Sequence, residues 1–207
     1  MQKLRNQYDL LMILSLIGIV PALFYYLFAQ KEIFIGLTWN TFLALLPFYF
    51  AIKANSAQNE KLRFFSAFLW LLFLPNAPYL ITDAIHISQN KGHEVFVFYL
   101  VLILSLTGLL SWLFSVRLML MRIPSALRQW NVIRQYGYLI LCILSGIGVA
   151  MGRFARLNSW EIFYKPHKVI YKTALMYTDF TPWLITILIS LILFSLNIKV
   201  KSINLFK

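Results

Sequence analysis

The chain has 207 residues, of which 60% are hydrophobic and only 13% are charged. A soluble domain of average composition has about 45–50% apolar and about 25% charged residues, so this composition excludes an ordinary soluble domain and indicates an integral membrane protein. The net charge of +12 does not predict a nucleic-acid partner, because the basic residues lie between apolar runs, where they set membrane orientation.

Six apolar runs are long enough to cross a lipid bilayer, because a spanning helix needs about 20 predominantly apolar residues. They occupy residues 10–29, 33–52, 64–85, 95–115, 136–152 and 183–198. We therefore predict an all-α, polytopic membrane protein with about six transmembrane helices, built as a single integral membrane domain over residues 1–207. The first run follows Lys3 and Arg5, but it is longer than a usual signal core and lacks a small-residue cleavage site, so we expect it to be retained.

The distribution of basic residues predicts the orientation. With the N-terminus inside, the cytoplasmic connections hold twelve of the 19 lysines and arginines and the outer connections hold seven. This bias predicts a multi-pass protein of the cell membrane with both termini in the cytoplasm. Five of the seven outer basic residues lie in one connection, between the fifth and sixth runs, so we expect a role for them other than topology. They are Arg153, Arg156, Lys165, Lys168 and Lys172.

The third run is interrupted by FLPNAPYLITDAIH at residues 73–86. Proline removes a backbone donor and clashes with the preceding turn, so Pro75 and Pro78 should break the helix near Asn76, which could cap a second half-helix. At a rise of 1.5 Å per residue, the break lies about 17 Å into a hydrocarbon core about 30 Å thick. Such a break is tolerated only where protein or a water-filled cavity satisfies the freed backbone groups.

The polar residues of this stretch, Asn76, Tyr79, Asp83 and His86, are spaced three, four and three apart. That spacing predicts one polar face of a helix. Polar groups inside a membrane are costly, so we interpret this stripe as a candidate binding or catalytic surface. The alternative is that Asp83 and His86 lie where the helix meets water and that Asn76 only satisfies the proline break.

The outer connection GRFARLNSWEIFYKPHKVIYK, residues 152–172, carries a second candidate site. Arg153 and Arg156 are one turn apart, so both guanidinium groups would point the same way if the helix continued, as suits a phosphate or carboxylate. The alternative is an anchor at the level of the lipid headgroups. After Pro166, apolar residues at helical spacing predict a short interfacial helix before the last span. The candidate anion-binding residues are Arg153, Arg156, Asn158, Trp160 and Glu161.

Two blocks, LPNAPYLITD at residues 74–83 and GRFARLNSWE at residues 152–161, resemble the family of uncharacterised prokaryotic membrane proteins catalogued as domain of unknown function 1361. The resemblance covers most of the chain. An aspartate usually follows NSW in that family, whereas this chain has Glu161, which keeps the charge but moves the carboxylate. The resemblance implies a polytopic membrane protein and brings no assigned activity or cofactor.

Motifs for metals and cofactors are weak. Asp83 and His86 have an i, i+3 spacing that could supply two metal ligands, but such a pair arises easily by chance. The single cysteine, Cys142, lies inside an apolar run and has no intrachain partner. No P-loop, dinucleotide fingerprint or zinc-protease motif is present. We predict no metal site and no cofactor.

Three functions of different classes remain open. The one we favour is binding or transport of an anion, such as a lipid phosphate or a small anion, at the outer face, where the half-helix near Asn76 meets Arg153 and Arg156. The second is a membrane enzyme acting on a lipid-linked substrate, with Asp83 or His86 as general acid or base. The third is a structural or assembly membrane protein without a ligand. In each case the lipid bilayer is a partner, and no oligomeric state is indicated.

The two unusual segments are expected to meet. Asp83 should approach Arg153 or Arg156 across the outer ends of the third and fifth spans, because the charge count places all three at one membrane level. An acid near the edge of the hydrocarbon core is less costly beside a basic partner.

Overall fold

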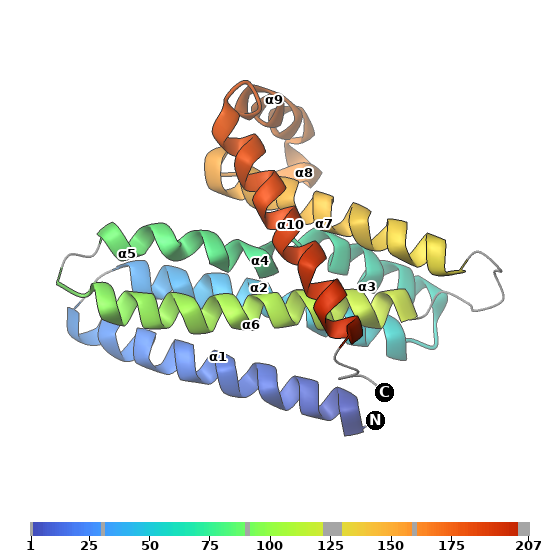
Figure 1. Ribbon diagram of the computed structural model, residues 1–207, viewed down its shortest axis with the longest axis horizontal. Coiled ribbons are helices and arrows are strands. Elements are labelled where there is room, and N and C mark those ends of the chain that lie inside the picture. The colour runs from blue at the N-terminus through green and yellow to red at the C-terminus, as the bar shows by residue number, and fades with distance from the viewer. Residues whose placement is uncertain (1, 30–31, 90–91, 122–129, 159–160, 203–207) are drawn as a thin grey trace.

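The computed structural model of the chain describes residues 2–29, 32–89, 92–121, 130–158 and 161–202. In these ranges every regular element is helical, which confirms the predicted all-α class (Figure 1). The elements are α1 (Gln2–Ala29), α2 (Glu32–Ser56), α3 (Glu60–Phe73), α4 (Asn76–Tyr79), the 3₁₀ helix η1 (Leu80–Ala84), α5 (Ile85–Gln89), α6 (Glu94–Met121), α7 (Trp130–Phe154), α8 (Glu161–Tyr164), α9 (Pro166–Met176) and α10 (Phe180–Ser202).

Within the described residues, five helical segments are long and apolar enough to cross a membrane. They are Leu4–Phe28, Glu32–Ser56, Glu60–Ser88, Glu94–Met121 and Gln135–Phe154. The helices α9 and α10 meet the same criterion as a pair that is bent by 98°, which makes a sixth span if the pair is counted as one. The predicted polytopic architecture, with a short helix before the last span, is therefore confirmed with five or six spans.

The spans form a bundle crossed by two oblique helices (Figure 1). α1, α2, the broken span and α6 lie side by side, α7 and α10 cross them, and α8 and α9 gather beyond the end of α7. α1 begins and α10 ends at the same end of the bundle (Figure 1), as an even number of crossings requires. The indole of the buried Trp112 on α6 donates a hydrogen bond to the Ser145 hydroxyl on α7 (2.9 Å) and ties the two parts together.

The predicted break in the third span is present, and one backbone amide and one side chain satisfy two of the carbonyls at the break. Pro78 has no backbone N–H, so the Leu74 carbonyl cannot accept its usual bond from four residues ahead. The Ala77 amide donates to that carbonyl instead (3.3 Å). This shift leaves the Phe73 carbonyl, which accepts a hydrogen bond from the side-chain amide of Asn76 (3.1 Å).

The break differs from the expected capping geometry at Asn76. Pro75, not Asn76, occupies the N-cap position of α4. The backbone turns from Leu74 through α4 and η1 without leaving the span, since residues 60–88 count as one continuous crossing. Further along, the Ser105 hydroxyl on α6 donates to the Leu80 carbonyl (3.0 Å). The break is thus accommodated by neighbouring protein, as its position inside a membrane demands.

Two glycines allow the neighbouring helices to close on the break. A Cβ atom at Gly108 on α6 would lie 2.1 Å from the Ala77 carbonyl oxygen, and one at Gly148 on α7 would lie 2.5 Å from Cβ of Pro75. Only glycine permits approaches this close. α7 therefore lies against the break, and its residue Arg153 lies close to Asp83 of η1.

Candidate functional site

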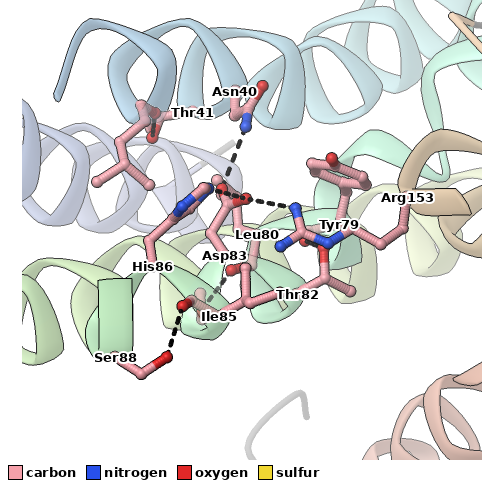
Figure 2. A network of polar contacts seen from close by, with 12 residues as sticks. Asn40, Thr41, Tyr79, Leu80, Thr82, Asp83, Ile85, His86, Ser88 and Arg153 are labelled. Atoms are coloured by element: carbon pink, nitrogen blue, oxygen red, sulfur yellow. Dashed lines mark hydrogen bonds and ion pairs between the residues drawn. The ribbon is translucent and has the colours of Figure 1, made fainter. Parts of the chain in front are cut away.

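Asp83 on η1 lies where three spans meet. It is 1% exposed, and its Oδ2 accepts a hydrogen bond from the Asn40 amide on α2 (3.1 Å). Its Oδ1 lies 3.9 Å from Nη1 of Arg153 and 3.9 Å from Nε2 of His86. Figure 2 shows the carboxylate between His86 and Arg153, with Asn40 reaching toward it from α2. The expected approach of Asp83 to an arginine of the outer connection is therefore present at Arg153.

Neither contact of Oδ1 is a hydrogen bond, and the one to Arg153 is a charge interaction. A separation of 3.9 Å exceeds hydrogen-bonding distance. Among the described residues, Oδ1 of Asp83 has no hydrogen-bond partner, although it is buried. Charge therefore holds the guanidinium group of Arg153 near the carboxylate, and none of its N–H donors is bonded to Oδ1.

Asp83 differs in placement from the other residues of the polar stripe. Asn76, Tyr79 and His86 line a common cavity, whereas Asp83 is buried beside it. The 3₁₀ winding of η1 accounts for the difference, because four residues at three per turn rotate a side chain by about 120° beyond a full turn, compared with about 40° in an α-helix. The stripe thus separates into a lining of three residues and one buried anchor.

The cavity has a volume of about 1100 Å³ and lies between α2, the broken span, α7 and the connection that follows α7. Its rim is open to the surroundings, since the lining residues Trp39, Phe68 and Leu144 are 54%, 48% and 44% exposed. The polar residues that line it are Asn40, Asn76, Tyr79, His86, Arg153, Arg156 and Asn158. Residues from both unusual segments of the sequence therefore contribute to one cavity.

Arg153 and Arg156 reach this cavity by a different route from the one predicted. The helix does not continue through Arg156, because α7 ends at Phe154, so the two side chains do not share a helical face. Arg156 instead adopts a left-handed backbone with φ of 50°, a conformation that costs an L-residue about 1–2 kcal/mol. Glycine is the usual residue at such a helix end, so the arginine retained there is a candidate for function.

Glu161 of α8 is engaged in folding the outer connection. Its Oε2 accepts a bond from Nζ of Lys168 (2.6 Å), and its Oε1 accepts one from the Asn158 amide (3.2 Å). The hydrogen bond from Lys168, followed by that from Asn158, lowers the pKa of the Glu161 carboxyl below its usual value. Nζ of Lys172 also donates to the Ala155 carbonyl (3.2 Å). Of the candidate anion-binding residues, Arg153, Arg156 and Asn158 line the cavity, Glu161 stabilises the loop behind it, and Trp160 lies outside the described residues.

Asn40 is the site residue that sequence reasoning missed. It lies inside an otherwise apolar span, in the stretch TWNT at residues 38–41, and a polar residue in such a run was a signal that could have found it. The side-chain amide of Asn40 reaches Asp83 only because α2 packs beside η1.

The charges of the site favour an anion. The two guanidinium groups of Arg153 and Arg156 outnumber the single carboxylate of Asp83, and none of the ion pairs among the described residues involves Arg156. Arginine donors bind phosphate or carboxylate in paired geometry. No cluster of three or more metal-ligating side chains occurs in the part of the chain that the structure describes.

Comparison with known proteins places the chain in a family. A family model described as "Protein of unknown function (DUF1361)" matches residues 39–196. No curated protein and no solved structure matches the chain. The matched range begins one residue before Asn40. It includes the broken span, Arg153, Arg156 and every described residue that lines the cavity.

Proposed function

The chain belongs to the DUF1361 family, and on that premise we propose that it is a multi-pass membrane protein that binds an anionic ligand, for retention or transport, in the cavity beside Asp83. The observation that carries the proposal is that Arg153 and Arg156 line one open cavity with His86 and Asn158, while the single carboxylate nearby leaves a positive excess. Arg153 is half-buried and Arg156 is exposed at the cavity, and a positive excess in such a cavity attracts an anionic group.

Asp83 acts in this proposal as a positioning residue. It is buried and held by Asn40, and it keeps Arg153 at the cavity wall through a charge contact of 3.9 Å. A guanidinium group has five N–H donors in a fixed fork, so this contact leaves donors for the ligand. Asp83 lies 3.9 Å from His86, beyond hydrogen-bonding distance, so the geometry favours an anchored cation over an acid–base pair.

The proposed location is the outer face of the cell membrane, with both termini in the cytoplasm. The bias of basic residues toward the connections at one side supports this orientation. The common end of the bundle at which α1 begins and α10 ends supports a shared side for the two termini (Figure 1). A cysteine replacing the exposed Lys165 should react with a membrane-impermeant maleimide added to intact cells, and one replacing the exposed Gln58 should not. Labelling of Gln58→Cys alone would invert the sidedness. Cys142 is buried, which keeps the background low.

Anion binding can be tested with purified protein in mixed micelles. Native mass spectrometry would compare retention of phosphatidic acid, which has an exposed phosphate monoester, with retention of phosphatidylcholine, whose headgroup is zwitterionic. We expect phosphatidic acid to be preferred. Arg153→Gln and Arg156→Gln should each weaken its binding about tenfold, because each removes charge-assisted hydrogen bonds worth about 1.5–3 kcal/mol.

The matched control is Lys165→Gln. Lys165 belongs to the same outer connection and is exposed, but it is not among the described residues that line the cavity. This variant loses the same charge and should bind phosphatidic acid as the wild type does. Equal losses in all three variants would mean that only the overall charge matters and would reject the proposed site.

A further inference from the structure

We infer that the anionic ligand is a membrane lipid, whose phosphate-bearing headgroup lies among the arginines while its hydrocarbon chain lies along the apolar wall of the same cavity. This inference rests on the proposed function and adds the class of ligand. It follows from how polar and apolar residues are distributed along the two helices that form the cavity walls.

The first lining residues of the broken span are apolar, and its polar lining residues come later, with Ile85 beside His86. Phe68, Leu71 and Leu72 of α3 line one end of the cavity, and Asn76 and Tyr79 of α4 line the next part. From Phe68 to Asn76 the wall extends about 12 Å at the rise of an α-helix. The change from apolar to polar lining therefore occurs within the cavity, along the axis of the span.

α7 repeats the same order on the opposite wall. Leu144, Ile147 and Met151 line the cavity before Arg153 and Arg156, and from Leu144 to Arg153 the wall extends about 13 Å. α3 and α7 both run from the end of the bundle at which α1 begins (Figure 1). One end of the two tracks is therefore apolar only, and the arginines and the polar groups of the broken span gather toward the other end, where Phe154 and Leu157 also line the cavity. This is the polarity of a lipid molecule.

The volume of the cavity also favours a lipid over a free anion. About 1100 Å³ is slightly above the range of about 300–1,000 Å³ typical of sites for organic ligands, and it is far larger than an inorganic phosphate requires. The rim residues Phe68, Leu71 and Leu144 are 48%, 44% and 44% exposed and apolar. In a bilayer such a rim borders hydrocarbon, so a lipid chain can lie in the apolar track without entering water.

The energetics define what each part of the ligand contributes. A hydrocarbon chain gains little when it moves from lipid tails to an apolar protein wall, because both surroundings are apolar. Selectivity should therefore come from the headgroup contacts with Arg153 and Arg156, and the apolar track should act by admitting the chain. Filling the track should exclude the lipid even though every charge remains in place.

The test fills the track on α7 and uses the neighbouring position as its control. Leu144 lines the cavity and is 44% exposed, whereas Ile143 is 42% exposed and is not among the described lining residues. Leu144→Trp should reduce retention of dioleoyl phosphatidic acid at least tenfold in native mass spectra, and Ile143→Trp should not. Glycerol 3-phosphate has the same headgroup without chains and should compete at least tenfold less well than the lipid, because only the lipid is concentrated in the micelle beside the cavity.

A second pair of variants guards against misfolding of Leu144→Trp. Leu71 on α3 lines the opposite wall, and Leu62 on the same helix is exposed without being among the described lining residues. Leu71→Trp should reproduce the loss and Leu62→Trp should not. Agreement between the two walls would support a chain lying between them.

The outcomes separate this inference from the proposed function. If glycerol 3-phosphate binds as tightly as phosphatidic acid, requires both arginines and is unaffected by Leu144→Trp, anion binding stands and the lipid inference is overturned. If the arginine variants bind phosphatidic acid as Lys165→Gln does, the proposed function fails and the inference fails with it. Equal losses in Leu144→Trp and Ile143→Trp would also overturn the lipid inference, because any exposed position on α7 would then serve.

Discussion

Two ion pairs lie near the cavity, Glu161 with Lys168 and Asp83 with Arg153, and their contact distances differ. Glu161 has both carboxylate oxygens engaged at hydrogen-bonding distance, one by Lys168 at 2.6 Å and one by a backbone amide at 3.2 Å. Asp83 is more deeply buried, yet its contact with Arg153 is 3.9 Å long and the oxygen facing that arginine has no hydrogen-bond partner among the described residues.

The difference shows which pair is structural and which is poised for a ligand. The Glu161 carboxylate, with both oxygens hydrogen-bonded, fixes a loop. The Asp83 pair is held by burial and by Asn40, and it leaves the guanidinium of Arg153 at the cavity wall. Shorter contacts would make a tighter pair but would consume the donors that an anion needs.

The largest expected effect comes from separating the buried pair. Arg153→Gln should destabilise the protein by about 3 kcal/mol, because it leaves the Asp83 carboxylate buried without its arginine. Asp83→Asn combined with Arg153→Gln should cost clearly less than the sum of the single losses. Thermal unfolding of the detergent-solubilised variants measures this coupling. Asp83→Asn combined with Arg156→Gln should be additive, and additivity in both cycles would show that the Asp83–Arg153 contact carries no energy.

A somewhat smaller effect is expected at Asn40. Asn40→Leu should destabilise by about 2 kcal/mol, because it removes the described hydrogen bond to the buried Oδ2 of Asp83, and a bond to a charged group contributes about 1.5–3 kcal/mol. Thr38→Val is the control, since the hydrogen bond that the Thr38 hydroxyl donates among the described residues stays within its own helix, at the Phe34 carbonyl. Equal unfolding midpoints for the two variants would place the support of Asp83 elsewhere.

Arg156 offers a variant in which stability and binding move in opposite directions. Arg156→Gly should stabilise the protein by up to about 1 kcal/mol, because glycine adopts a φ of 50° without strain. The same variant should lose retention of phosphatidic acid about tenfold, as Arg156→Gln does. Unfolding and native mass spectra measured on one preparation test both effects. Lower stability with unchanged binding would assign this arginine a structural role.

The smallest effect is expected for the Glu161–Lys168 pair and depends on pH. The folded-state pKa of Glu161 is below its usual value of 4.5, first because of Lys168 and then because of Asn158. Its stabilisation is therefore fully present above the usual pKa and is lost as the pH falls through the lowered folded value. In Glu161→Gln the free energy of unfolding should fall less steeply than in the wild type as the pH drops from about 5 to about 3. If the free energy of unfolding of Glu161→Gln falls in acid as steeply as that of the wild type, the pair does not support the fold.

The sequence by itself determined the features that follow from local chemistry. The lengths of the apolar runs predicted the spans, because backbone groups in a bilayer must bond within a helix. Pro75 and Pro78 predicted the break, since proline lacks the required donor wherever it occurs. The approach of Asp83 to one of the two arginines, Arg153 or Arg156, was also predictable, because opposite charges at one membrane level lower each other's cost.

The tertiary structure alone decided which partners those features have. The packing of α2 beside η1 brought Asn40 to Asp83, and the 3₁₀ winding of η1 separated Asp83 from Asn76 and Tyr79. The end of α7 at Phe154 placed the two arginines on different backbone elements around one cavity. Each of these outcomes depends on contacts between segments that are distant in the chain, where close packing selects one backbone path among several that local propensity allows.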